Sequence, residues 1–324
     1  MHAIRQSEFG DHNTLVYAEL PDPAPGAGQV RIAVRAAGVH LIDTVIRQGV
    51  QRGPFPLPEL PMTPGREVAG VVDLVGPGVD DSWLGRRVVA HLGQASGGYA
   101  ELALAPADAL HALDDSVSDE AAVAMIGTGR TTAGILATTP VGAGDVVLVT
   151  AAAGGIGSLL VQAVRHAGGY VVGVAGGATK TDRVRALGAD AAVDYRQPDW
   201  PARVRAALGD RELTLAYDGV GGAVGKAALE LLGLAGRLSM YGWSSGEPTP
   251  LTAMDLYAHG LTVTVPIGPA MLRGGLRPLE SYALAEATAG RWVPPVTAFP
   301  LKDAADAHRA LETRATIGKT VLLP

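Results

Sequence analysis

Residues 145–175 read DVVLVT-AAAGGIG-SLLVQAVRH-AGG-YVVGVA, and this stretch decides the fold of the second half of the chain. Its first and last pieces, 145–150 and 170–175, are short Val-rich runs, which are typical of strands buried on both faces. The piece at 158–166 has apolar residues at helical spacing. The stretch therefore predicts a strand, a tight turn, a helix and a second strand.

The turn between the first strand and the helix carries three glycines. Gly154 and Gly157 allow the backbone to turn sharply and to approach a diphosphate, which the amides and dipole of the following helix would bind. We therefore predict a dinucleotide site in which the cofactor contacts are Ala153, Gly154, Gly155, Ile156 and Gly157. The alternative is a tightly packed structural turn in a parallel sheet.

Composition excludes several classes of protein. A chain of 324 residues is long enough for two domains, and it has no run of eighteen apolar residues and no apolar leader. We therefore expect no membrane span and no membrane partner, and a cytoplasmic location. The absence of cysteine excludes disulfides, thiolate catalysis and sulfur-ligated metals. A net charge of −6 with scattered Lys and Arg predicts that nucleic acid is not a partner.

The first 120 residues alternate short apolar runs with Gly and Pro turns, which predicts an antiparallel, barrel-like module. A loop at 48–65 holds five prolines, and so long a loop in a compact domain is usually functional. The expected elements are a hairpin over 1–20, strands over 29–38, 65–75, 85–91 and 99–104, and a short helix over 39–47.

The pattern changes at Ser118, where Ser-Asp-Glu opens a helix predicted over 121–139. Strands and helices then alternate, which is the signature of a doubly wound parallel sheet. Strands are predicted over 146–150, 170–175, 191–194, 213–217, 237–241 and 261–265, and helices over 158–167, 179–187, 200–208, 222–232 and 279–289. The tail, with a helix over 304–312 and a strand over 319–323, is expected to pack on the first module.

Six motifs, taken in order and with their spacing, resemble one family over essentially the full chain: GVHLID at 38–43, PGREVAG at 64–70, the 151–157 turn followed by Gln162, YDGVG at 217–221, GRLSMYG at 236–242 and RATIG at 314–318. The chain resembles the zinc-independent, NADPH-dependent quinone oxidoreductase branch of the medium-chain dehydrogenase/reductase superfamily.

The resemblance implies an α/β fold of two domains. One is a GroES-like, β-barrel-type catalytic domain formed by 1–120 and 296–324. The other is a doubly wound parallel-sheet Rossmann domain over 121–295 that binds NADPH. The resemblance also implies an active site in the cleft between them and a homodimer joined through the Rossmann sheets.

The segment after the second Rossmann strand favours NADPH over NADH. An acidic residue there would bind the ribose hydroxyls of NAD, but the segment contains none, and Lys180 and Arg183 follow Gly176. Cationic side chains suit a 2′-phosphate. We place Gly176 and Lys180 at the cofactor; the other interpretation of Lys180 and Arg183 is the solvated face of a helix.

The resemblance adds four cofactor contacts by motif position. Tyr195 and Arg314 are implied at the same phosphate, and Tyr241 and Gly242 beside the nicotinamide. Zinc-dependent relatives keep Gly-His-Glu and a cysteine as metal ligands, whereas this chain has Gly-Arg-Glu at 65–67 and no cysteine. We therefore predict no metal and interpret Glu67 as structural.

Without a metal or a nucleophile, the predicted chemistry is direct hydride transfer to an electrophilic acceptor, with a hydrogen bond to the developing oxyanion. Candidate donors are His40 and Tyr241, and Asp43 lies one helical turn from His40, where it could orient the ring. The family commonly has asparagine at the position of His40, and a histidine can also donate a proton. In the alternative interpretation His40 is structural and Asp43 caps its own helix.

Two departures from the family bear on the acceptor. Relatives tend to place a tyrosine after the glycine where this chain has Val50, which weakens the quinone assignment and leaves α,β-unsaturated aldehydes or ketones open. Arg130 is charged where relatives are apolar, and it forms either a salt bridge or a site for a polar acceptor. The predicted small-molecule partner is thus a quinone or enone. The alternative functions are an enoyl reductase acting on a thioester or polyketide, and a crystallin-like protein that binds NADPH without turnover.

Overall fold

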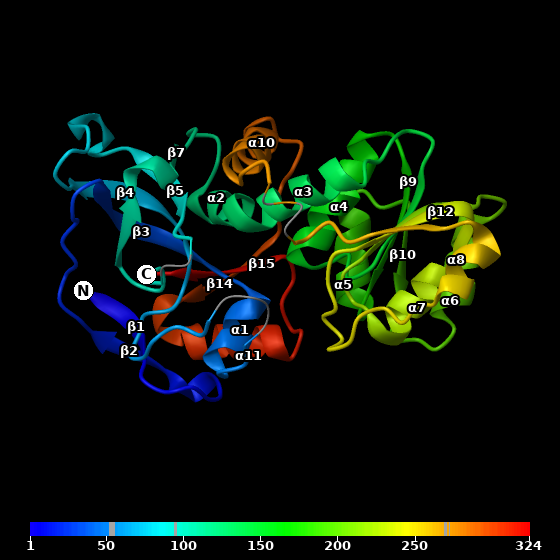
Figure 1. Cartoon of the computed structure of the whole chain (residues 1–324), viewed down its shortest axis with the longest axis horizontal. Helices are drawn as coiled ribbons and strands as arrows, with labels where there is room; N and C mark the ends of the chain where they lie inside the picture. Colours follow the sequence, from blue (N-terminus) through cyan, green and yellow to red (C-terminus); the bar gives the residue numbers. More distant parts are fainter. Residues whose placement is uncertain (52–55, 94–95, 269–270, 272) are drawn as a thin grey trace. The chain divides into compact units, whose positions relative to one another are not determined.

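The computed structural model describes residues 1–51, 56–93, 96–268, 271 and 273–324 (Figure 1). Part of the proline-rich loop at 48–65 thus lies outside the described residues. The chain forms two compact units, unit 1 from Met1–Gly127 and Pro294–Pro324, and unit 2 from Thr128–Val293. The sequence-based domain boundaries remain a prediction. None of the helices in the described ranges is both long and apolar enough to span a bilayer.

Unit 1 contains a hairpin and a larger sheet. The hairpin pairs β1 (His2–Gln6) with β2 (Leu15–Glu19). The sheet has the order β14-β15-β3-β4-β5-β7, with β6 also paired to β3, and every pairing is antiparallel except that of β14 with β15. Its strands are β3 (Gln29–Val39), β4 (Glu67–Val75), β5 (Arg87–His91), β6 (Leu102–Pro106), β7 (Leu110–Ala112), β14 (Val296–Pro300) and β15 (Lys319–Leu323).

The C-terminal tail completes this sheet, as the sequence predicted, because β15 pairs with β3. Helix α11 (Ala304–Glu312) packs beside α1 (Leu41–Arg47) in the same unit. Short 3₁₀ turns connect the strands, at η1 (His12–Thr14), η2 (Asp81–Trp83), η3 (Ala107–Ala109) and η5 (Leu301–Asp303).

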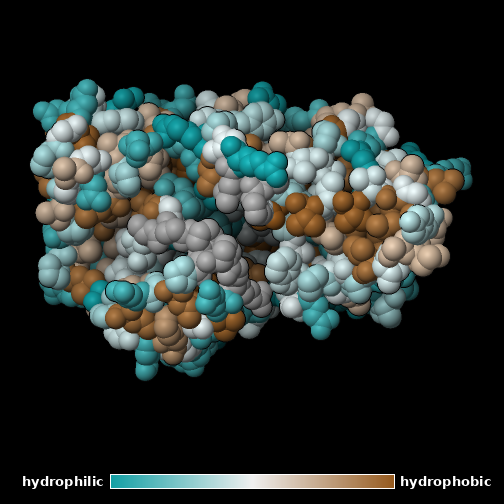
Figure 2. All heavy atoms as spheres, viewed as in Figure 1, coloured by the Kyte–Doolittle hydropathy of each residue, from teal (hydrophilic) through white to brown (hydrophobic). Residues whose placement is uncertain are grey.

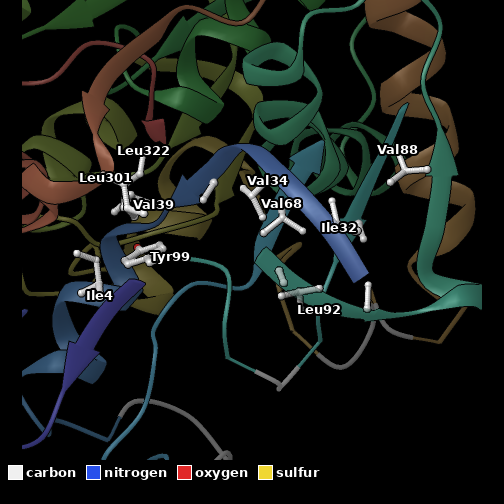
Figure 3. Close-up of a cluster of buried hydrophobic side chains, with 14 of the residues drawn as sticks. Ile4, Ile32, Val34, Val39, Val68, Val88, Leu92, Tyr99, Leu301 and Leu322 are labelled. Carbon is white, nitrogen blue, oxygen red and sulfur yellow. The ribbon is translucent and has the colours of Figure 1, made fainter. Parts of the chain in front are cut away.

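Figure 3 shows the core of unit 1, in which side chains from both ends of the sequence meet. Ile32 and Val68 come from β3 and β4, while Leu301 and Leu322 come from the tail, and all four are at most 2% exposed. Burying such a side chain contributes roughly 1.5–3 kcal/mol. The tail is therefore an integral part of the unit's core.

Two predicted elements of the first half differ from the structure by more than two residues at an end or by an interruption. The strand expected over 99–104 begins at Leu102, because the backbone of Tyr99 bonds elsewhere: its N–H donates to Pro64 O at 2.8 Å and its carbonyl accepts from Ile4 N at 2.8 Å. The backbone of Tyr99 thus bonds to Pro64 and to Ile4 of β1, and it does not pair with β3.

The helix expected over 121–139 is interrupted. Ser118 caps α2 (Asp119–Ala124) as predicted, by accepting from Ala121 N at 3.2 Å, but a π-helical turn η4 (Met125–Gly129) separates α2 from α3 (Arg130–Thr138). The wider turn coincides with Gly127, whose Cα lies against the Glu67 carboxylate, so that a Cβ there would overlap Glu67 Oε1.

Unit 2 is a parallel sheet of order β10-β9-β8-β11-β12-β13. Counted from β8, this is the order 3-2-1-4-5-6 that defines a Rossmann fold, so the predicted doubly wound sheet is confirmed. The strands are β8 (Val146–Val149), β9 (Tyr170–Ala175), β10 (Ala191–Asp194), β11 (Leu213–Asp218), β12 (Leu232–Met240) and β13 (Thr262–Thr264). The helices are α4 (Gly155–His166), α5 (Ala178–Ala186), α6 (Trp200–Leu208), α7 (Gly222–Glu230), α8 (Ala253–His259) and α10 (Arg277–Thr288).

Alternate residues of the central strand face two separate cores. Val147 and Val149 belong to one cluster and Leu148 to another, and all three are completely buried. Burial on both faces explains the unbroken apolar run in the sequence. The strand order reverses between β8 and β11, and ligands of such sheets bind at the carboxyl edge of that reversal.

Candidate functional site

The glycine turn lies at this reversal point. Helix α4 begins at Gly155 and not near Ser158, so Gly155, Ile156 and Gly157 form its first turn and Gly154 is its N-cap. Backbone N–H groups in a first turn have no intrahelical acceptor. The structure therefore presents the amides of residues 155–157 at the carboxyl end of β8, where a diphosphate would bind.

Close packing explains the third glycine of the turn. Ala151 has a positive φ of 48°, and its carbonyl oxygen lies against the Cα of Gly157. A Cβ at Gly157 would overlap Ala151 O and the Ala152 backbone, whereas at Gly154 it would remain 3.2 Å from Ala151 O. The neighbouring Ala153 is 3% exposed and packs into the core below the turn.

Asp218 fixes the second loop at the reversal point. Its carboxylate accepts from Thr150 Oγ1 at 2.7 Å, from Thr249 Oγ1 at 2.6 Å and from the Val220 amide at 2.9 Å. These bonds join the ends of β8 and β11 to the segment after β12. Asp218 thus stabilises the turn at the end of β11.

The turns after β9 and β10 lie together. Tyr195 Cε2 is 3.6 Å from the position that a Cβ on Gly176 would take, so the structure brings these two predicted contacts side by side. Asp194 Oδ1 accepts from the Gly177 amide at 2.8 Å and holds the two turns in place. Lys180 lies in the first turn of α5, and it has an interaction partner in this structure.

Sequence reasoning missed Arg196. Its guanidinium lies across Gly177, where a Cβ would overlap Nη2, and its Nε donates to Asp194 Oδ1 at 3.4 Å. The side chain is 64% exposed. The sequence does offer a signal, because a basic residue directly follows Tyr195. Both residues come right after the end of a strand, from which a side chain can reach the turn at Gly176 and Gly177.

Tyr241 and Gly242 directly follow β12. The Tyr241 hydroxyl donates to the Thr150 carbonyl oxygen at 3.2 Å, and its ring lies against Gly219. Burial raises the pKa of Tyr241 well above its ordinary value. Tyr241 would therefore have to give up the bond to Thr150 in order to donate to an acceptor.

Arg314 belongs to unit 1, whereas the residues that the sequence places with it at the phosphate belong to unit 2. It follows α11 with a positive φ of 57° and is exposed. Its predicted cofactor contact stays a prediction.

In unit 2, Arg130 Nη1 forms an ion pair with Glu280 Oε1 at 3.1 Å, in line with its interpretation as a salt-bridge residue.

Asp43 caps α1 in the structure. The backbone N–H of His40, the N-cap residue, donates to Asp43 Oδ2 at 2.8 Å, and the hydroxyl of Tyr99 donates to the same oxygen at 3.1 Å. Arg66 Nη2 lies 3.4 Å from Asp43 Oδ1. The carboxylate therefore fixes the backbone of His40, as in the capping alternative of the sequence analysis.

The ring of His40 contacts two other charged residues. His40 Nε2 lies 2.6 Å from Glu67 Oε1 and 2.8 Å from Lys319 Nζ, and Lys319 Nζ donates to Glu67 Oε2 at 2.7 Å. Burial alone would raise the pKa of Glu67, but His40 and Lys319 outweigh it and hold that pKa well below its ordinary value. The sequence analysis did not predict that Lys319 lies at this site. The sequence shows only a charged residue at the start of an apolar strand.

A second buried polar chain runs from Asp43 toward the tail. Arg47 Nη1 donates to His308 Nδ1 at 3.3 Å, so the hydrogen of the neutral ring is on Nε2, which donates to the Tyr99 oxygen at 3.3 Å. The Tyr99 hydroxyl then donates to Asp43. Burial lowers the pKa of His308 to about 4, which keeps the ring neutral at pH 7.

The donor set does not suit a catalytic zinc. The chain has no cysteine, and Arg66 stands between Gly65 and Glu67 with its guanidinium directed to Asp43. Across 1–51, 56–93, 96–268, 271 and 273–324, no three His, Asp or Glu side chains are grouped so as to hold a metal ion. No step of the chemistry below passes through a metal.

A GroES-type module with an antiparallel sheet and a Rossmann unit with a glycine turn define the class of two-domain dehydrogenases. Residues 26–115 match the alcohol dehydrogenase GroES-like domain family, and residues 155–277 match the zinc-binding dehydrogenase family.

Individual relatives narrow this class. The chain is 34% identical to a 2-haloacrylate reductase of Burkholderia sp, over 100% of the chain and 99% of the relative. It is 31% identical to a quinone oxidoreductase of Salmonella typhimurium, over 99% of each. The structure of Escherichia coli quinone oxidoreductase complexed with NADPH matches with a TM-score of 0.86 and 30% identity over 100% of both chains. The chain belongs to the quinone oxidoreductase branch of the medium-chain dehydrogenase/reductase superfamily.

Proposed function

We propose that this protein is an NADPH-dependent oxidoreductase that transfers a hydride to quinones or other α,β-unsaturated carbonyl acceptors without a metal. The observation that carries the proposal is the turn at 151–157, where three amides face the carboxyl edge of the sheet at its order reversal. The relatives support it, because one is named for reduction of an unsaturated acceptor, others for quinones, and one structure contains NADPH.

Each part of the chain has a separate task in this proposal. When bound, NADPH supplies the hydride. The amides of 155–157 bind the diphosphate, Tyr241 and Gly242 border the nicotinamide, and His40 holds the proton that reduction consumes. The 2′-phosphate is bound by Gly176, Lys180, Tyr195 and Arg196, with Arg314 as a further contact.

The activity is tested by following NADPH oxidation with 1,4-benzoquinone and, in parallel, with a simple enone. We expect turnover of both classes. Faster turnover of the quinone would show that the segment at Val50 still accepts a planar ring. NADPH binding without oxidation by any acceptor would contradict the proposal and support a crystallin-like binding role. Oxidation only with enoyl thioesters would instead identify an enoyl reductase.

Arg196→Ala is expected to weaken NADPH binding by roughly fivefold to twentyfold and to leave NADH binding unchanged. Hydrogen bonds to a charged group contribute roughly 1.5–3 kcal/mol, and the exposure of Arg196 reduces that value. The measurement is the Kd of each nucleotide by fluorescence titration. Arg203→Ala is the matched control, because Arg203 is 57% exposed and pairs with Asp199. Equal losses for NADPH and NADH would remove Arg196 from the phosphate site.

We also propose that the protein is a homodimer joined at the free edge of the unit 2 sheet. Among the described residues, strand β13 has no partner on its outer side. Large apolar side chains are exposed directly after β13 and on α8, which packs against β12: Val265 is 61% exposed, Met254 69% and Tyr257 80%. Figure 2 shows apolar side chains gathered over unit 2. A monomer in sedimentation at micromolar concentration would contradict this proposal.

A further inference from the structure

We propose that Trp243 is a specificity-determining residue. Its indole forms one flat wall of the acceptor site and favours planar, fused-ring acceptors such as naphthoquinones over small open-chain enones. The inference rests on the proposed function and names the class of acceptor that this site prefers. It concerns residues 242–246, which follow β12 and Tyr241 and which we call the indole loop.

The indole loop lies at the nicotinamide half of the sheet. A Rossmann sheet consists of two halves that each bind one mononucleotide. Strands β8, β9 and β10 form one half of this sheet, and β11, β12 and β13 form the other. The predicted 2′-phosphate contacts Gly176 and Tyr195 follow β9 and β10, so the adenosine belongs to the first half. The carboxyl end of β12 therefore lies at the reacting half of the cofactor.

Backbone hydrogen bonds hold the indole loop against the turn after β11. The N–H of Ser244 donates to Gly219 O at 3.1 Å. The N–H of Ser245 donates to Val220 O at 2.8 Å. The turn that accepts these bonds is itself fixed by the Asp218 carboxylate, which accepts from the Val220 amide. The backbone of the loop is thus anchored at the reversal point of the sheet.

The base of the Trp243 side chain packs closely on Gly221. A Cβ on Gly221 would be 3.0 Å from Trp243 Cβ and would overlap Glu247 O. Gly221 also has a positive φ of 70°, which other residues adopt only with strain. Because this close packing and the backbone bonds act together, the indole leaves the loop from a fixed point.

The indole is within reach of an acceptor that lies over the nicotinamide. Tyr241 and Gly242 are predicted to border that ring, and consecutive Cα atoms lie about 3.8 Å apart. Hydride transfer requires the reacting atoms to come within about 3–3.5 Å of each other. The Tyr241 ring lies against Gly219 and its hydroxyl is bonded to Thr150, so it is already occupied. Trp243 is the next side chain along the loop.

The environment of Trp243 differs from that of the other three tryptophans. Trp200 and Trp292 are 6% and 2% exposed, and Trp83 stacks on the Arg86 guanidinium. Trp243 is 48% exposed, and no side chain in the described part of the chain stacks on its ring or accepts from its Nε1–H. Single exposed apolar side chains are common on proteins. Trp243 is distinguished by its anchored place beside the predicted nicotinamide site.

An indole in this place selects for flat acceptors. Planar π systems stack on an aromatic face and bury it, and an electron-poor quinone ring complements the electron-rich indole. A small open-chain enone covers little of that face. The indole should therefore lower the KM of a naphthoquinone much more than that of a small enone, without entering the chemical step.

Trp243→Leu tests this selection, because leucine is apolar but has no flat ring. We expect the KM for 1,4-naphthoquinone to rise about fivefold to tenfold, which is the size of a stacked aromatic contact with the area it buries. The KM for methyl vinyl ketone and the kcat for both acceptors should stay close to the wild-type values. Trp243→Phe keeps a flat ring and should restore most of the naphthoquinone preference. NADPH oxidation at saturating NADPH gives both constants.

A second measurement needs no turnover. With NADP⁺ in place of NADPH no hydride is available, and a quinone in contact with an indole quenches its fluorescence by accepting an electron from the excited state. The chain has no cysteine that a quinone would alkylate. Naphthoquinone should quench the wild-type protein saturably, and Trp243→Leu should lose this saturable part. Trp83→Leu is the matched control and should keep both the saturable quench and the wild-type KM.

Three results would overturn the inference: an unchanged naphthoquinone KM in Trp243→Leu, an equal rise in KM for both acceptors, or a saturable quench that persists in this variant. Failure of the proposed function has a different signature. In that case no acceptor oxidises NADPH with the wild-type protein, while the quench still decides whether a planar quinone binds at Trp243.

Discussion

Gly157→Ala should weaken NADPH binding by roughly a hundredfold. The added Cβ would overlap Ala151 O and the backbone of Ala152, and neither is the flexible end of a side chain. The first turn of α4 would have to move away from β8, and the amides that bind the diphosphate would move with it. A hydrogen bond to a charged group contributes roughly 1.5–3 kcal/mol, and losing two such bonds at the lower end of that range accounts for a loss of this size.

The same substitution should lower the free energy of unfolding by about 1–3 kcal/mol, because overpacking shifts the backbone. Gly154→Ala is a graded comparison, since its Cβ would be 3.2 Å from Ala151 O. Gly144→Ala is the control, since its Cβ would have open space. Fluorescence titration gives the Kd and chemical unfolding the stability. A Gly157→Ala protein that binds NADPH within threefold of the wild type would sink the proposed diphosphate site.

The stability of the protein should fall as the pH drops from 6.5 to 4 because His308 must remain neutral in the fold. Burial lowers its folded-state pKa to about 4, against 6.5 in the unfolded chain. Between these values the unfolded chain binds more protons, so protonation favours unfolding. The contribution of His308 is fully present above pH 6.5 and is lost by pH 4. At about 1.4 kcal/mol per unit, it amounts to about 3 kcal/mol.

His308→Leu tests this prediction. The variant loses the hydrogen bonds to Arg47 and Tyr99, so it should be less stable than the wild type at pH 7, but its stability should change less between pH 6.5 and 4. Chemical unfolding at a series of pH values gives both quantities. His259→Leu, at an exposed position on α8, is the control and should keep the wild-type slope. An identical slope in His308→Leu would show that another group is responsible.

Local sequence patterns determined most of the secondary structure. The Val-rich runs, the glycine turn and the alternation with helices predicted every strand of the Rossmann sheet, and the strand at 319–323 was predicted with its observed bounds. These features depend on near neighbours in the sequence: periodicity sets which face is buried, and Ser or Gly sets where a helix begins or ends. The continuous helix predicted over 121–139 is wrong. Its π-helical turn includes Gly127, which packs against the carboxylate of Glu67, a residue far away in the sequence.

In the candidate site, too, the features that depend on neighbouring residues could be predicted, and those that depend on distant residues could not. The amides of 155–157 were predictable because the residues that form the turn are adjacent in the sequence. The contacts of His40 with Glu67 and Lys319 were not predictable in this way. Strand β3 lies between β4 and β15, with Thr320 opposite Val39 and Val68 opposite Ala37. This register brings His40, Glu67 and Lys319 to one end of three strands.

Register and side-chain direction are tertiary properties. A shift of one residue in the pairing of β15 would turn Lys319 to the other face of the sheet and away from His40. Arg196 was missed for a similar reason, since only the position of Gly177 shows where its guanidinium lies. The sequence by itself determined the two folds and the nucleotide turn, because short-range patterns encode them. The partners of His40 were decided only by the tertiary structure, because strand pairing joins residues that are far apart in the chain.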